Sequence, residues 1–580
     1  MPPDVLDAAS IARALRDVSL YLQLKGENAF KVRAYDLAAD RVLGVSERLP
    51  ALVSEGRLAE LPNIGPALAE KIVTLHTTGS LPLLETLRAA YPPGILELLQ
   101  LPDLGPRKVA VLWTSLGVGD LAALEQALRE GRVRTLKGFG EKSEARLLAS
   151  LERHRTTHAR HRLGEVLPVA TALREELRNA PGVVRIEVAG SLRRFCETVS
   201  DVDIVASAAE AAPVLDALAR RAGVAEVLAQ GESKCSVRLS DGLQVDLRVL
   251  PDADFATALH HFTGSKAHHV RLRGRARDLG LTISEWGVFR GEEKLPVPDE
   301  AALYALLGMD YVPPELREDM GEYEAALAGT LARDFILPSD VRGAVHAHTT
   351  WSDGRSSLLE MARAASRRGL EYFTVTDHSG AAGYAGGLSP ERLVSQWKEI
   401  ERVQAQVPAI RLLRGLEVDI LEDGSLDLPD ELLQELDVVI ASVHVRHGQD
   451  ARAITERVLR ALDHPYTDVL GHPTGRLLQK RDPAPLLMEE VFARAAERKV
   501  ALEVNGNPDR LDLHAAHVRA ALAAGCQLVA SVDAHDTEAL GNVVYAATTA
   551  RKGGARRSDV LNTLGTDAFL RALRERHPRR

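Results

Sequence analysis

The stretch GSLRRFCETVSDVDIV (Gly190–Val205) joins a glycine turn and two arginines to an apolar segment with two aspartates one residue apart. If DVDIV is a strand, Asp201 and Asp203 point to one face, because side chains alternate along a strand. Two neighbouring carboxylates repel each other, which favours a cation between them. The alternative interpretation is two acids at the polar start of a strand without a metal. Other parts of the sequence distinguish these two interpretations.

Length and composition set the frame for that decision. With 580 residues the chain is too long for one ordinary core, so several domains are expected. The net charge of -9 argues against a generally basic surface but leaves room for a local basic stripe. No apolar run approaches the roughly 20 residues that span a bilayer, and the acidic start lacks the layout of a signal peptide. Three separated cysteines argue against disulfides and for a reducing cytoplasm.

A third acid of the same kind occurs in LQVDLRVL (243–250). Asp246 projects from an apolar alternating strand, where a carboxylate is costly unless it is paired or bound to a metal. Arg248, two residues on and on the same face, is the alternative partner. Upstream, the opening turn offers close backbone approach, a hydroxyl and guanidinium groups, which suit a triphosphate, at Gly190, Ser191, Arg193 and Arg194.

A basic segment follows in HHFTGSKAHHVRLRGRARD (260–278), where a glycine turn opens a helix. So many cations on one short segment of an acidic protein favour contact with a duplex backbone, and a solvated basic helix is the alternative. The basic residues are Lys266, Arg271, Arg273, Arg275 and Arg277.

Residues 1 to 155 show one recurring pattern, an apolar entry and a tight turn ending in glycine, then a helix. This pattern resembles the helix-hairpin-helix element, which presents backbone N–H groups at a helix N-terminus to a nucleic-acid phosphate. Three ordinary helix connections are the alternative. The copies are LPNIGPALAEKI (61–72), LPDLGPRKVAVL (101–112) and LKGFGEKSEARL (136–147), and the glycines expected at DNA are Gly65, Gly105, Gly138 and Gly140.

The order GS-x-RR, D-x-D, V-D-L-R and F-T-G-S-K, over about residues 10 to 325, resembles the family X DNA polymerases. The resemblance implies nucleotidyl transfer, with deoxynucleoside triphosphates and gapped or primed DNA as partners. It makes Asp201, Asp203 and Asp246 the catalytic ligands of two Mg²⁺ or Mn²⁺ ions. It implies nucleotide contacts by Gly190, Ser191, Arg194, Phe262, Gly264 and His269, and DNA contacts by Lys266, Arg273 and Arg277.

The chain departs from that family at a few positions. Phe195 and Cys196 fill a turn where the family has at least one small residue, and His261 and His269 replace a Tyr and an Asn. Sugar and base selection are therefore open. Lys71 matches the position of a Schiff-base lysine in relatives with lyase activity, but an ordinary solvated helix lysine is the preferred interpretation.

Residues 341 to 580 repeat apolar β-rich runs that end in polar residues and precede helices. Parallel strands need helical crossovers, so seven such units predict a parallel barrel, and barrel active sites lie at the carboxyl ends of strands. Nine metal-type ligands fall at those ends, which suits two or three Zn²⁺, Mn²⁺ or Fe²⁺ ions better than one. The ligands are His346, His348, Asp353, His378, Glu417, His444, His472, Asp533 and His535.

This pattern resembles the PHP (polymerase and histidinol phosphatase) phosphoesterase domain, a distorted seven-stranded barrel, over about residues 341 to 570. The resemblance implies metal-dependent cleavage of phosphoesters, and in polymerases of this family a 3′→5′ exonuclease or 3′-end-processing activity. Arg446, His447 and Arg476 lie just past the ligands and could hold the strand being cut, or be ordinary surface residues.

The predicted protein is multidomain, α and α/β. It would fill short gaps in DNA repair and trim 3′ ends, as a monomer in the cytoplasm with the nucleoid. A DNA-bound PHP nuclease whose polymerase half is a binding platform is one alternative, and a scaffold without chemistry is another. The expected domains are an N-terminal helical (8 kDa-like) DNA-binding domain at 1–85, fingers at 86–158, a nucleotidyltransferase palm at 159–253, a thumb at 254–325, a linker at 326–340 and the PHP barrel at 341–580.

Overall fold

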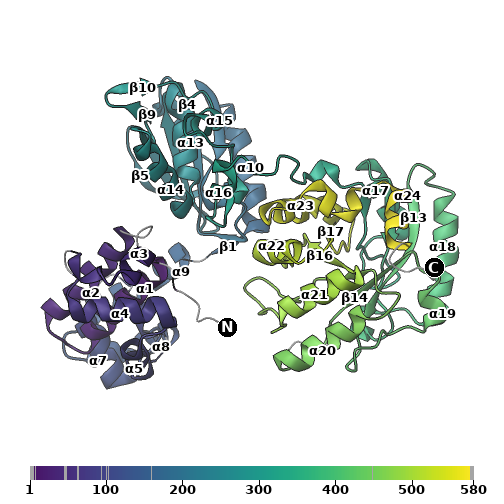
Figure 1. The fold of residues 1–580 in the computed structure, drawn as a ribbon, viewed down its shortest axis with the longest axis horizontal. Coiled ribbons are helices and arrows are strands. Elements are labelled where there is room, and N and C mark those ends of the chain that lie inside the picture. Colours follow the sequence, from purple (N-terminus) through teal and green to yellow (C-terminus); the bar gives the residue numbers. More distant parts are fainter. Residues whose placement is uncertain are drawn as a thin grey trace. The chain divides into compact units, whose positions relative to one another are not determined.

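The computed structural model describes Leu6 and residues 8–44, 49–61, 64–92, 94–99, 101, 104–158, 160–446 and 448–574. The chain divides into two compact units, residues 1–159 and 160–580 (Figure 1). His447, one of the residues considered for strand binding, lies outside the described part. Every helix in that part is too short or too polar to cross a membrane.

The first unit is helical in its described residues. Its helices pack around α1, whose Ile11, Leu15 and Val18 are fully buried. Helices α4, α7 and α9 start directly after Gly65, Gly105 and Gly140, as the repeated motif predicts. The helices are α1 (Ala8–Leu24), α2 (Ala29–Gly44), α3 (Leu49–Ser54), α4 (Pro66–Thr78), α5 (Pro82–Ala89), α6 (Ile95–Leu98), α7 (Pro106–Leu116), α8 (Leu121–Arg129) and α9 (Glu141–His158).

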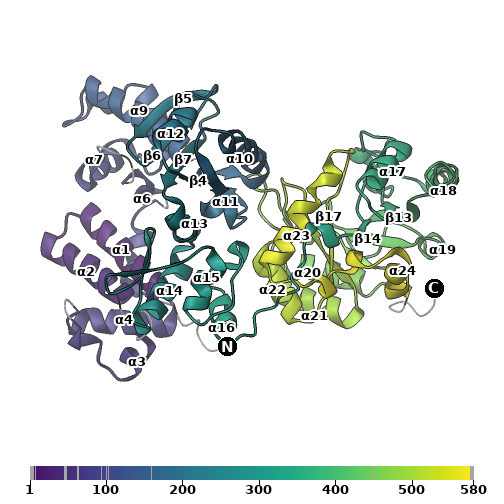
Figure 2. The ribbon, with the colours of Figure 1, turned by 90° about the horizontal axis from the view of Figure 1, so that it is seen from above.

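The second unit begins with the palm, a five-stranded sheet in the order β2-β4-β7-β6-β5. Strands β4 and β7, which carry the predicted acids, are central and parallel neighbours. Helices α10 and α12 pack on this sheet (Figure 2). The elements are β1 (His161–Arg162), α10 (Leu163–Arg178), β2 (Val183–Val188), α11 (Gly190–Arg193), β3 (Thr198–Val199), β4 (Asp201–Ala208), α12 (Ala212–Ala219), β5 (Val224–Gln230), β6 (Lys234–Leu239) and β7 (Gln244–Leu250).

The thumb follows as helices around a three-stranded antiparallel sheet, β10-β9-β8. Its core includes Leu272 of the basic helix and Leu303. The elements are α13 (Phe255–Thr263), α14 (Lys266–Asp278), β8 (Thr282–Ser284), β9 (Gly287–Arg290), β10 (Glu293–Leu295), α15 (Glu300–Leu306) and α16 (Glu322–Leu327).

The last part of the chain is a barrel of seven parallel strands in sequence order. A bridge between Ala347 and Ala534 joins the extensions of the first and last strands. At the opposite end, where the strands begin, Phe569 of α24 stacks on Tyr372 with ring centroids 4.9 Å apart. The strands are β11 (Gly343–Ala344), β12 (Tyr372–Val375), β13 (Arg411–Asp419), β14 (Val438–Ser442), β15 (Val469–Leu470), β16 (Ala501–Asn505) and β17 (Leu528–Ser531).

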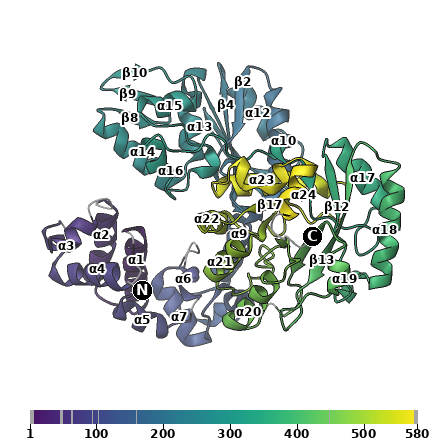
Figure 3. The same ribbon diagram turned by 45° about the vertical axis from the view of Figure 1, so that its right-hand side comes forward.

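Helices surround the strands of this barrel, with α17 to α19 on one side and α20 to α23 on the others (Figure 3). They are α17 (Leu358–Arg367), α18 (Pro390–Gln404), α19 (Asp430–Leu433), α20 (Ala451–Leu462), α21 (Met488–Arg498), α22 (Ala515–Ala523), α23 (Val543–Lys552) and α24 (Thr566–Arg574). The predicted fold class, a helical start, a palm with thumb and a seven-stranded barrel, is confirmed.

Palm and barrel share a packed boundary inside the second unit. Leu511 and Tyr545 of the barrel belong to the palm core, and the Tyr545 ring lies 5.9 Å from that of Phe195. The segment predicted as a linker is also packed, because Phe335 joins the thumb core while Ile336 joins the barrel core. The bulky Phe195 therefore has a structural role at this boundary.

Candidate metal centres of the barrel and the palm

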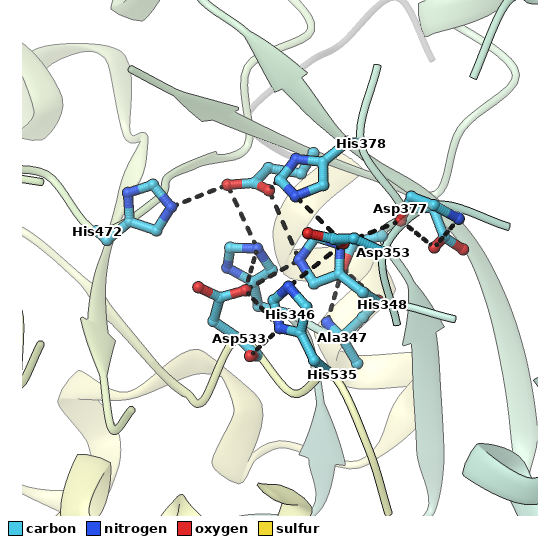
Figure 4. A network of polar contacts seen from close by, with 12 residues as sticks. His346, Ala347, His348, Asp353, Asp377, His378, His472, Asp533 and His535 are labelled. Carbon is cyan, nitrogen blue, oxygen red and sulfur yellow. Dashed lines mark hydrogen bonds and ion pairs between the residues drawn. The ribbon is translucent and has the colours of Figure 1, made fainter. Parts of the chain in front are cut away.

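The nine predicted barrel ligands lie together at the carboxyl ends of the strands (Figure 4). Glu417, which is fully buried, is at the centre of the group. Its Oε2 lies 2.9 Å from His378 Nδ1. Its Oε1 lies 3.1 Å from His444 Nε2 and 3.0 Å from His472 Nε2. One carboxylate thus links ligands from four strand ends.

Two other carboxylates extend the cluster on either side. Asp533 Oδ1 lies 2.9 Å from His348 Nε2 and 3.6 Å from His346 Nε2. Asp353 Oδ1 lies 3.3 Å from His535 Nε2. Three groups bring ligand atoms within 4.8 Å of one another, namely His348, Asp353, His378 and His535; His346, His348 and Asp533; and His378, Glu417 and His444.

Further carboxylates, which the sequence did not single out, orient these ligands. Glu503 of β16 accepts a hydrogen bond from His346 Nδ1 at 2.7 Å. Asp419 accepts one from His444 Nδ1 at 3.0 Å. A carboxylate behind a ligating imidazole fixes its tautomer and ring orientation and raises its basicity. The second layer therefore supports a role for both histidines as metal ligands.

The charges of the cluster are strongly coupled. Burial lowers the pKa of His348 to about 4, with the nearby His378 acting in the same direction. Burial also opposes protonation of His378, but Glu417 and Asp353 raise its pKa to about 10. Burial and the neighbouring carboxylates thus act in opposite directions on the pKa values of these histidines.

The donor set fits divalent transition metals. Among the described residues, both Glu417 carboxylate oxygens are buried without a hydrogen bond, as are His346 Nε2 and both ring nitrogens of His348. Buried polar atoms without partners are rare and costly, and these all face the same small space. Imidazole with carboxylate is the donor chemistry of Zn²⁺, Mn²⁺ or Fe²⁺.

The palm brings its three acids together on adjacent strands. The register pairs Asp203 with Asp246, and Asp201 lies two residues before Asp203 on the same strand. Burial and the charges of Asp201 and Asp246 raise the pKa of Asp203 to about 7. In the described chain, their oxygens do not reach the 4.8 Å spacing seen in the barrel. Repulsion among the three carboxylates favours the binding of cations between them.

Asp246 is held by its own strand neighbours. It accepts hydrogen bonds from Ser236 Oγ and from Gln244 Nε2, the latter at 3.2 Å, and Lys234 Nζ lies 3.2 Å from its Oδ1. Arg248, the alternative partner, lies instead over the Phe262 ring at 4.6 Å. The guanidinium pairing considered for Asp246 is therefore wrong.

Comparisons with known proteins cover both halves of the chain. Residues 258–318 match the DNA polymerase beta thumb and 344–507 the PHP domain, and 7–81 and 95–153 match helix-hairpin-helix models. The chain is 37% identical over 568 residues to the DNA polymerase/3′-5′ exonuclease PolX of Bacillus subtilis (strain 168), covering 97% of this chain and 99% of that protein. The chain belongs to the PHP-containing family X DNA polymerases.

The barrel alone resembles a second group of proteins. It is 30% identical over 240 residues to a probable phosphatase of Thermoanaerobacter sp. (strain X514), covering 38% of this chain and 89% of that protein. A probable phosphatase of Clostridium novyi (strain NT) is 32% identical over 169 residues, covering 28% of this chain and 64% of that protein. Both matches are similarities of one domain of this family X polymerase.

The polymerase's predicted triphosphate turn is only partly open. Gly190 has φ +63°, and a Cβ there would lie 2.2 Å from Asp203 Oδ2, so glycine lets the turn approach the acids. Arg194 Nε lies 3.2 Å from Glu318, and Nη1 donates to the Thr263 carbonyl beside Gly264. Ser191 is half-buried on α11.

Two arginines with predicted ligand roles are bound within the protein. Arg193 donates to both oxygens of Glu300, at 3.0 and 2.6 Å. Arg476 donates to both oxygens of Glu197, at 3.1 and 2.5 Å, across the palm–barrel boundary. In the described residues most of their guanidinium donors contact carboxylates of the protein, and their contact with phosphates stays a prediction.

The thumb helix α14 divides its basic residues between two roles. Arg271 pairs with Asp319 at 2.9 Å and Arg275 donates to the Leu307 carbonyl at 3.2 Å. The remaining three, which were predicted at DNA, are exposed and form no ion pair within the described residues: Lys266, Arg273 and Arg277. These three side chains are available to a phosphate backbone.

The predicted base pocket of the thumb contains a histidine without partners. His269 is buried, and neither ring nitrogen forms a hydrogen bond within the described part of the chain. Burial, with His261 next, lowers its pKa to about 4. A neutral imidazole at this position, with its ring 5.0 Å from that of His261, offers one donor and one acceptor.

In the first unit, the three helix N-termini behind Gly65, Gly105 and Gly140 are exposed. Gly138 has φ +91°, as the tight turn requires. Their N–H groups are accessible to phosphates. Lys71 donates to the Ala67 carbonyl at 3.0 Å on its own helix, as an ordinary helix lysine does.

Proposed function

We propose that the chain is a repair-type DNA polymerase that fills short gaps, and that its barrel removes nucleotides from 3′ ends. The observation that carries this proposal is the convergence of Asp201, Asp203 and Asp246 beside the Gly190 turn, in a chain that also carries nine clustered barrel ligands. Sequence identity over nearly the whole of a DNA polymerase/3′-5′ exonuclease supports it.

In the palm, the three aspartates would hold two Mg²⁺ or Mn²⁺ ions. In the barrel, the histidines with Asp353, Glu417 and Asp533 would hold two or three Zn²⁺, Mn²⁺ or Fe²⁺ ions. When bound, divalent cations supply Lewis acidity and neutralise phosphate charge in both centres.

The palm's own residues orient the substrates. Ser191 and Arg194 would bind the β- and γ-phosphates at the short helix α11, after Arg194 exchanges Glu318 for phosphate. Asp246, fixed by Ser236 and Gln244, would lie beside the primer 3′-hydroxyl. The 3′-hydroxyl would lose its proton to water and form a bond to the α-phosphorus as the bond to the leaving pyrophosphate breaks.

Extension of a gapped, 5′-phosphorylated duplex tests the polymerase half. Asp203→Asn should reduce extension by about 10³-fold, because a cation ligand contributes several kcal/mol to the transition state. Asp241→Asn is the matched control, since Asp241 is an exposed acid in the β6–β7 turn of the same palm. Equal extension activity of Asp203→Asn and the parent would contradict the assignment of the palm as the polymerase active site.

A second candidate function is a DNA-bound nuclease whose palm only binds DNA. The ion pair between Arg194 and Glu318 favours it, because it occupies a predicted triphosphate ligand. On the same gapped duplex, degradation without any extension by the parent, at any nucleotide concentration, would select this candidate.

A further inference from the structure

One aromatic ring stands exposed beside the barrel ligands. Tyr384 is 70% exposed, and its ring centroid lies 6.2 Å from that of His378 and 6.3 Å from that of His444. A single exposed aromatic residue needs no explanation by itself. This ring, however, borders two predicted metal ligands whose own side chains are only 6% and 7% exposed, His378 and His444.

The loop beneath Tyr384 is firmly built. Ala382 and Ala385, on either side of the ring, are buried. Leu388 N–H donates to the His378 carbonyl at 2.8 Å, so the loop returns to the ligand strand. Arg392 donates to the carbonyls of Gly386 and Gly387 at 2.7 and 3.0 Å. The ring is therefore presented on a fixed support, which lowers the entropy cost of stacking a ligand on it.

A guanidinium group lies beside another ligand of the same cluster. Arg510 Nε is 3.5 Å from Asp533 Oδ2, and its side chain is 17% exposed. Its Nη1 is buried and has no hydrogen bond to any residue that the structure describes. Asp533 and the two histidines beside Tyr384 belong to the same ligand cluster, because Glu417 lies within 3.1 Å of both of these histidines and within 3.6 Å of His348, which contacts Asp533.

The Tyr384 ring and the Arg510 guanidinium could contact two different parts of one ligand. A base stacks on an aromatic face whatever its sequence, and an arginine with a free N–H suits a phosphate oxygen. A terminal nucleotide offers a base and a phosphate joined by a sugar. A small phosphate ester without a base would use only the arginine.

We propose that Tyr384 and Arg510 form a subsite for the 3′-terminal nucleotide of DNA, with its base stacked on the tyrosine ring and its phosphate held by the arginine. The inference rests on the proposed exonuclease function and names the feature that selects nucleic acid there. Tyr384 accordingly determines specificity, whereas Arg510 positions the phosphate beside the metal ligands.

The first test compares two single-stranded oligonucleotides, one with a normal 3′-terminal nucleotide and one with an abasic terminus, with Mn²⁺. The parent should show a KM about tenfold higher for the abasic end, from the loss of one stacking contact. Tyr384→Leu should raise KM for the normal end about tenfold and remove the difference, while Tyr384→Phe keeps it. An unchanged preference in Tyr384→Leu overturns the subsite.

A second readout needs no catalysis. With EDTA present, an oligonucleotide ending in 2-aminopurine should lose fluorescence on binding the full chain, because the base stacks. Tyr384→Phe should quench as the parent does and Tyr384→Leu should not. Trp286→Leu, an exposed aromatic of the thumb, is the control and should quench normally. Quenching by Tyr384→Leu equal to the parent refutes the stacking.

Arg510 is tested by a base-independent effect. Arg510→Gln should raise KM for normal and abasic ends equally, by about tenfold, with metal content by elemental analysis as in the parent. Loss of metal with unchanged DNA affinity would instead assign Arg510 to the support of Asp533. If the parent degrades neither oligonucleotide, the exonuclease proposal fails, and the fluorescence experiment still decides the stacking.

Discussion

Replacing Gly190 by alanine should lower polymerase activity about 10²-fold while leaving the fold and the nuclease intact. The residue lies at φ +63° in the turn that faces the palm acids. A Cβ there would be 2.2 Å from Asp203 Oδ2 and 3.1 Å from its Cγ. The added methyl group and the proposed cation ligand cannot occupy these positions together.

The size of the effect follows from that overlap. A carbon–oxygen contact must open to about 3.0 Å, so the carboxylate has to move by roughly 0.8 Å. Misplacement of a reacting group by about 1 Å costs roughly 10²-fold in rate. The positive φ adds a cost of about 1–2 kcal/mol to the free energy of folding.

Gly182→Ala separates the two contributions, because Gly182 has φ +84° in the same palm and a Cβ there would meet no atom within 4 Å. Both variants should melt a few degrees below the parent. In single-turnover extension of a gapped duplex, only Gly190→Ala should lose about 10²-fold, with 3′ degradation unchanged. Full extension by Gly190→Ala would refute the reasoning, as would an equal loss in Gly182→Ala.

Three further outcomes are expected. Glu503→Gln should lower barrel metal affinity about 10- to 100-fold, because it weakens the orientation of His346; unchanged metal content after dialysis against a metal buffer would contradict this. Lys552→Met should raise the nucleotide KM about fivefold without affecting degradation, because Lys552 Nζ donates to the Arg194 carbonyl at 2.6 Å; equal loss of both activities would count against it. In EDTA, thermal melts should show that the stability of the protein falls as the pH rises from about 4 to about 7. The reason is that the fold raises the pKa of Asp203 from 3.8 to about 7, so the folded state binds more protons in this range. Asp203→Asn should flatten the slope of stability against pH, and identical slopes in variant and parent would contradict the prediction.

The ligands of the barrel could be predicted because each follows an apolar run at a strand end. Glu503 was missed, although it is a buried acid in the apolar strand ALEVN, the same signal that identified Asp246. A systematic reading of acids within apolar strands would have found it. Asp377, next to the ligand His378, was also missed. It accepts hydrogen bonds from Thr349 N and Oγ1 at 2.8 and 2.7 Å, and it thereby organises the ligand loop.

The roles of the arginines could not be predicted in the same way. Arg193 pairs with Glu300, 107 residues away, and Arg476 with Glu197, 279 residues away. Nothing local distinguishes an arginine that binds phosphate from one that joins two domains. Phe195 likewise departs from the family in the nucleotide turn, and its sequence neighbours do not indicate that its ring packs near Tyr545.

The central claim is that two separate centres act on one DNA end, and nucleotide turnover during idling tests it most directly. On a primed duplex supplied with only the next nucleotide, labelled at the α-phosphate, the parent should convert the triphosphate steadily to monophosphate. Asp203→Asn and His348→Ala should each abolish this conversion, and mixing the two variants should restore it. Monophosphate formation by either variant alone, or none by the mixture, would contradict the account.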